Sequence, residues 1–106
     1  MGVKEQKLAS VQSEIARERA ESLARGSRRL RATLDKLGEV DARAVAGIGN
    51  VRSQFVAAAS EACLAYLIQR EFMGFGAQDA ESIRRDFQVP QEVWSGMGAM
   101  RSTSTK

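Results

Sequence analysis

The most apolar stretch of the chain is residues 55–68, FVAAASEACLAYLI, in which twelve of the fourteen residues are apolar. Wound as an α-helix, this stretch presents apolar side chains in almost every direction, whereas a surface helix presents them along one stripe. The pattern therefore predicts a central helix that is covered on more than one side. Other segments of this chain, or a second chain, have to provide that cover.

The N-terminal third of the chain has single apolar residues spaced mostly three, four or seven positions apart. This spacing predicts one long amphipathic helix over residues 3–37, with a narrow apolar stripe typical of a coiled coil. Gly38 suits the left-handed position that ends a helix, and Asp41 suits the cap of the next one. The apolar positions of the stripe are Leu8, Val11, Ile15, Leu23, Leu30, Leu34 and Leu37.

A second helix is expected over residues 42–73, ended by the glycine at position 74. Folding at Gly38 then gives an antiparallel hairpin. The three-four spacing also continues through Gly38, so that one helix of roughly seventy residues is an alternative. Three glycines and a buried Asp41 argue against the single helix, and we favour the hairpin.

The hairpin register follows from the position of the turn. Folding at Gly38 would place Ile15 beside Leu64. It would also place Leu23 beside Val56. Because the stripe of the first helix is narrow, this pairing covers only one side of the central helix.

The remainder of the chain predicts one or two short helices that pack on the hairpin. The first is expected from Ala80 to Phe87, and the second begins with Pro90 in its first turn. The polar end, residues 101–106, is expected to be a disordered tail. The sequence thus predicts an all-α fold, with a single helical domain over residues 1–100.

Two sources of cover for the central helix remain open. One is the C-terminal segment, which is rich in large apolar residues from Phe72 to Trp94. The other is a second copy of the chain, because a run of alanines makes a smooth surface that suits close helix–helix contact. We therefore expect a homo-oligomer. The residues expected at its interface are Phe55, Ala58, Ala62, Ala65 and Tyr66.

Charge adds one polar signal. The net charge of the 106 residues is +3, but residues 1–37 carry nine basic and five acidic side chains. Arg25, Arg28 and Arg29 fall on one face of the first helix, where they could contact successive phosphates of a nucleic acid. The competing interpretation is an ordinary solvated helix face.

The sequence offers little for catalysis. It contains no histidine, which removes the commonest general base and metal ligand. Its only cysteine, Cys63, lies in the apolar helix and is interpreted as structural. Glu61, the one acid in that helix, is expected to pair with an arginine. We predict no enzyme activity, no cofactor and no metal site.

The remaining features indicate a cytoplasmic protein that does not span a membrane. A lone cysteine allows no intramolecular disulfide, and the central apolar run is shorter than the roughly 18–20 residues that cross a bilayer. Two hypotheses for function follow. The first is a self-associating helical protein that acts through contacts with proteins, including a partner that the sequence does not identify. The alternative is a small dimeric nucleic-acid-binding protein that uses Arg25, Arg28 and Arg29.

Overall fold

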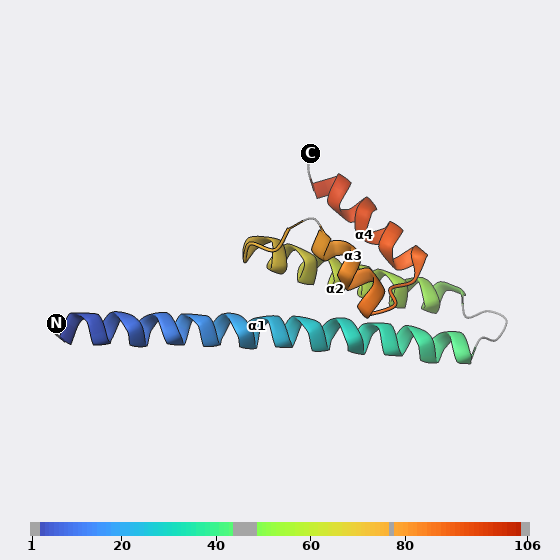
Figure 1. Cartoon of the computed structure of the whole chain (residues 1–106). Coiled ribbons are helices and arrows are strands. Elements are labelled where there is room, and N and C mark those ends of the chain that lie inside the picture. The colour runs from blue at the N-terminus through green and yellow to red at the C-terminus, as the bar shows by residue number, and fades with distance from the viewer. Residues whose placement is uncertain (1–2, 44–48, 77, 105–106) are drawn as a thin grey trace.

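The structure, a computed structural model, describes residues 3–43, 49–76 and 78–104 of the chain. The described residues form four helices and confirm the all-α hairpin with two short C-terminal helices (Figure 1). The molecule is elongated, with extents of 70 × 30 × 23 Å. The helices are α1 (Val3–Ala42), α2 (Gly49–Phe72), α3 (Gln78–Asp86) and α4 (Gln91–Ser104).

The turn of the hairpin lies later in the chain than predicted. α1 continues through Gly38 and ends at Ala42, so the prediction that Gly38 ends the first helix was wrong. Asp41 is a residue of α1 instead of a cap, and its carboxylate pairs with Arg52 of α2. A single glycine costs a helix only about 1 kcal/mol. Burial of Leu37 beside it is enough to keep the helix going.

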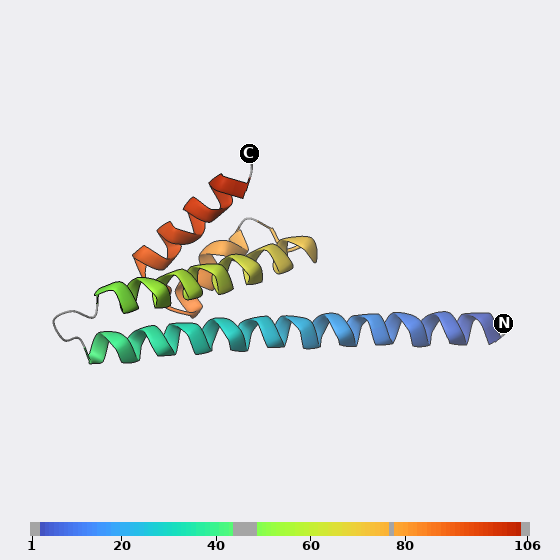
Figure 2. The same ribbon diagram turned by 180° about the vertical axis from the view of Figure 1, so that it is seen from behind.

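This later turn changes which residues face each other. The Gln69 amide donates a hydrogen bond to the Ser22 hydroxyl, and Gly26 lies against Tyr66. The expected pairing of Leu23 with Val56 was therefore wrong by several helical turns. As a consequence α2 ends well before the N-terminus of α1, and the first part of α1 extends beyond it (Figures 1 and 2).

α2 lies at the centre of the molecule, with α1 along one side and α4 packed on another (Figure 1). Phe87, which follows α3, packs against both α1 and α2. Its ring centroid lies 5.8 Å from that of Tyr66 in α2 and 4.9 Å from the guanidinium carbon of Arg31 in α1. Side chains from all four helices thus build one core. The buried apolar residues are Leu30, Leu34, Leu37, Ala59, Ala62, Cys63, Tyr66, Leu67, Ile83, Val89, Val93 and Met97.

The end of α2 follows the prediction. Gly74 has a φ of 98°, a left-handed conformation that glycine adopts without strain. Its N–H bonds the carbonyl of Glu71, and the N–H of Phe75 bonds the carbonyl of Arg70. This pair of bonds is the Schellman motif, which satisfies the last carbonyls of a helix.

The C-terminal segment covers α2 only in part. Ile83 and Val93 are buried, as expected of a cover, but Phe72 is 91% exposed. α4 continues to Ser104, into the segment predicted as a polar tail, and residues 105–106 lie outside the described residues.

Candidate functional site

The five residues predicted for an interface separate into two groups. Ala62 and Tyr66 are buried by the protein's own α1 and C-terminal helices, and Phe55 is half-buried beside the same core. Ala58 and Ala65 are exposed. Of the five, these two alanines are therefore the most accessible to another molecule, Phe55 is partly accessible, and Ala62 and Tyr66 are covered by this chain.

The two exposed alanines belong to a longer apolar face of α2. Ile68 and Phe72 follow Ala65 at three and seven positions, and both are exposed. Residues at this spacing lie on the same side of a helix. We call Ala58, Ala65, Ile68 and Phe72 the open face of α2. Neither C-terminal helix buries it.

A second uncovered apolar surface lies on the part of α1 that extends beyond α2. We call residues 3–18 of α1 the N-terminal arm. The arm carries the apolar stripe Leu8, Val11 and Ile15, which are 59%, 52% and 43% exposed. Exposure of three large apolar side chains along one stripe is unfavourable in water, since full burial of each would stabilise the protein by about 1.5–3 kcal/mol.

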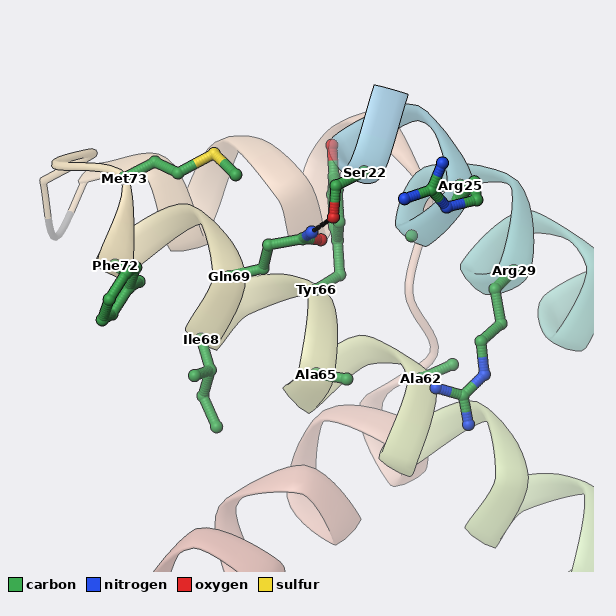
Figure 3. Close-up of a pocket in the computed structure, with 11 residues that line it drawn as sticks. Ser22, Arg25, Arg29, Ala62, Ala65, Tyr66, Ile68, Gln69, Phe72 and Met73 are labelled. Carbon is green, nitrogen blue, oxygen red and sulfur yellow. Dashed lines mark hydrogen bonds between the residues drawn. The ribbon is translucent and has the colours of Figure 1, made fainter. Parts of the chain in front are cut away.

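Three residues of the open face, Ala65, Ile68 and Phe72, help to form one wall of a groove against α1 (Figure 3). The groove has a volume of about 620 Å³. Its α1 wall contains Arg25 and Arg29, and Figure 3 shows both side chains on this wall, across from the α2 residues. The lining residues are Ser22, Arg25, Gly26, Arg29, Ala62, Ala65, Tyr66, Ile68, Gln69, Phe72 and Met73.

A smaller hollow continues the groove toward the N-terminal arm. Ile15 and Glu18 line it, together with Ser22 and Arg25, which line the main groove as well. Ile15 of the arm and the open face of α2 therefore line neighbouring hollows, which share Ser22, Arg25 and Met73.

The structure places all three predicted basic residues on the surface of α1. Arg25, Arg28 and Arg29 are exposed, and Arg29 lies 3.7 Å from the carboxylate of Glu61. Glu61 is thus paired with an arginine, as expected from the sequence. Because both members of this pair are exposed, it contributes little to stability.

Two further arginines hold the helices together. Arg52 of α2 donates hydrogen bonds to Asp41 of α1 and Glu92 of α4, and these bonds hold the pKa values of both carboxyls below their usual range. Arg70 forms a two-pronged pair with Asp79, with N–O distances of 2.5 and 2.8 Å. These pairs position α1, α3 and α4 against α2.

The chemistry of the described residues offers few reactive groups. Burial raises the pKa of the Cys63 thiol to about 11, so that it is protonated at neutral pH and a poor nucleophile. Within the described ranges, no group of three or more cysteine and acidic side chains is arranged to hold a metal ion. The same ranges include no helix that is apolar and long enough to cross a membrane.

Fold and surface together define a small helical-hairpin protein with an uncovered apolar arm and an open groove. The chain belongs to DUF6665, described as a family of unknown function, which it matches over residues 3–105. Comparison with curated proteins found no match, and comparison with solved structures found none either.

Proposed function

We propose that the protein is a non-enzymatic, self-associating helical protein that acts through protein–protein contacts, as an adaptor, assembly factor or structural component. The observation that carries this proposal is the uncovered apolar arm of α1 next to the open groove on α2. Contiguous exposed apolar surface of this kind marks interaction sites on proteins.

Several properties of the chain support a role without catalysis. Its only cysteine is buried with a raised pKa, and the sequence contains no histidine. The surface instead carries large exposed apolar side chains, on the N-terminal arm and on the open face of α2. The single cysteine also fits a reducing compartment, and we place the protein in the cytoplasm on that basis.

The proposal is tested by the mass of the protein in solution. Sedimentation equilibrium between about 1 and 100 μM, a range that spans typical affinities, is expected to give a mass that rises toward twice the 11.6 kDa of one chain. A chain that keeps the mass of a monomer at every concentration contradicts self-association. If the protein is a monomer, co-purification of one other protein in a fixed ratio from native cells would show that the exposed surface binds a different chain.

A second candidate function is binding of nucleic acid through α1. It is favoured by the exposure of Arg25, Arg28 and Arg29, which lie three and four positions apart on one face of α1, a spacing that suits phosphate contacts. A gel shift with duplex DNA and single-stranded RNA at about 50 mM salt tests it. If the protein binds, replacing the three arginines with alanine should flatten the dependence of the affinity on salt. Absence of a shift at this low salt ends this candidate.

A further inference from the structure

The charges on one side of α1 follow a simple order along the helix. Glu14 and Glu18 lie three and seven positions after Val11, so they flank the apolar stripe of the N-terminal arm. Arg25 and Arg29 continue the same side of the helix, at seven and eleven positions after Glu18. This side of α1 is therefore acidic in the arm and basic along the groove.

This order makes α1 self-complementary when two copies lie antiparallel. The two acids, Glu14 and Glu18, are four residues apart, and so are the two arginines, Arg25 and Arg29. Four residues span about 6 Å along the helix. Glu14 and Arg29 are equally far from the point between Glu21 and Ser22, and the same holds for Glu18 and Arg25. A two-fold axis near Ser22 would place both acids of one copy beside both arginines of the other.

The apolar residues fit the same arrangement. In one chain, Arg29 lies beside Glu61 and Gly26 lies against Tyr66, so the basic part of α1 runs alongside the middle of α2. An arm placed against Arg25 and Arg29 of the partner thus reaches the partner's open face of α2. The arm brings three large apolar side chains, and the open face offers alanines that permit close approach.

The handedness of the two surfaces also agrees. On the arm, the acidic residues lie on one side of the apolar stripe. On the receiving chain, the arginines of α1 lie next to the open face of α2 across the groove (Figure 3). In the antiparallel pair of helices, Glu14 and Glu18 then meet Arg29 and Arg25. Ile15 comes level with residue 28 of the partner's α1, inside the groove, whereas Leu8 and Val11 come level with residues 35 and 32, just beyond Arg29.

Phe72 provides an independent observation. Gln69 contacts Ser22, and Phe72 lies three residues further along α2, at the level of the proposed axis. A two-fold axis brings the same residue of both copies together. The arrangement therefore covers the most exposed large apolar side chain of the described residues, which a single chain leaves 91% accessible.

We infer that the groove between α1 and α2 receives the last part of the N-terminal arm, residues 14–18, of a second copy of this chain. The two copies are related by a two-fold axis near Ser22, with Glu14 and Glu18 of each copy paired to Arg29 and Arg25 of the other. This pairing deepens the proposed self-association and rests on it. It uses Arg25 and Arg29 but leaves Arg28 outside the contact.

Reversal of charge tests the pairing directly. One variant carries Glu14→Arg and Glu18→Arg, and the other carries Arg25→Glu and Arg29→Glu. Each variant alone places like charges at both contacts of its own dimer, so its dissociation constant should rise by about tenfold or more. Because all four side chains are exposed, each variant should keep the helical circular dichroism of the wild type.

Mixing the two variants gives the decisive measurement. In a mixed dimer, both contacts again join acids to arginines, so equimolar mixing should restore a dimer that contains one copy of each variant. Native mass spectrometry distinguishes the mixed dimer, because the two variants differ in mass. A control variant with Arg17→Glu and Arg28→Glu has the same change in charge outside the groove and should dimerise as the wild type does.

The outcomes separate the pairing from the proposed function. If the wild type dimerises and both reversed variants dimerise equally well alone, the pairing is wrong while self-association stands. The same conclusion follows if both variants dissociate but mixing restores no dimer. A wild type that remains monomeric overturns self-association and the pairing together.

Discussion

At the scale of single residues, the packing of α4 on α2 depends on Gly96. A Cβ added to this glycine would lie 2.5 Å from the hydroxyl oxygen of Ser60, which is fully buried. That oxygen cannot move away easily, because it is bonded to the carbonyl of Val56 at 2.8 Å. Gly96 is therefore the residue that sets the distance between α2 and α4.

Gly96→Ala should destabilise the protein by about 1–2 kcal/mol, since the strain of overpacking exceeds the gain in helix propensity. Gly98→Ala in the same helix is the matched control. No atom lies within 4 Å of its added Cβ, so it should stabilise the protein by up to about 1 kcal/mol. Urea unfolding at equal protein concentration measures both, and equal effects of the two changes would contradict the close contact.

Gln88 carries backbone strain that the sequence did not reveal. It follows the end of α3 with a φ of 51°, in the left-handed region, and the N–H of Val89 bonds the carbonyl of Arg84 as in the motif at Gly74. Gln88→Gly should therefore stabilise the protein by about 0.5–1 kcal/mol. The same change at Gln54, inside α2, should destabilise it by about 1 kcal/mol. Thermal unfolding that gives the two variants effects of the same sign would refute this account.

At the scale of helices, Arg52 connects three elements and makes stability depend on pH. Its hydrogen bonds lower the pKa of Asp41 and of Glu92. A carboxyl with a lowered pKa stabilises the fold above its ordinary pKa, and this contribution is lost as the pH falls through the lowered value. The melting temperature should therefore fall between about pH 5 and pH 3. Arg52→Gln should reduce this fall in melting temperature, whereas the control Arg28→Gln should leave it unchanged. If the wild type and both variants show the same dependence of melting temperature on pH, Arg52 does not have this role.

The sequence predicted the helices better than their relative positions. Periodicity identified the long first helix, the buried α2 and two C-terminal helices, because apolar spacing reports directly which residues need cover. The turn was placed wrongly because Gly38 looked like a helix end. A glycine ends a helix only where the chain has to turn, and here the burial of Leu37 continues the helix.

The error in the turn also affected which predicted interface residues are exposed. Which side of α2 faces α1 depends on the register, so the sequence could not separate exposed Ala65 from buried Ala62 and Tyr66. The open face of α2 was predicted in part through Ala58 and Ala65. The N-terminal arm was not predicted to be uncovered, because a hairpin that turns at Gly38 places Ile15 beside α2.

At the scale of the whole molecule, the elongated shape has a consequence for folding. α1 is much longer than its partner α2, so the arm extends beyond α2 (Figure 2), and the three residues of its apolar stripe are 43–59% exposed. Helices in proteins gain most of their stability from packing of the apolar face against other elements, and the apolar stripe of the arm is largely exposed. In the proposed dimer, the groove of the second copy stabilises the arm, so association and folding are coupled.

This coupling predicts that the melting temperature rises with protein concentration. A variant with Leu8→Gln, Val11→Gln and Ile15→Gln removes the apolar stripe, and its melting temperature should be independent of concentration. Its α1–α2 core should still unfold cooperatively, because none of the three side chains belongs to that core. Ala9→Gln, Ser13→Gln and Ala20→Gln place the same side chain on the opposite side of α1 and should preserve the concentration dependence. If the stripe variant keeps that dependence as well, the arm does not contribute to association.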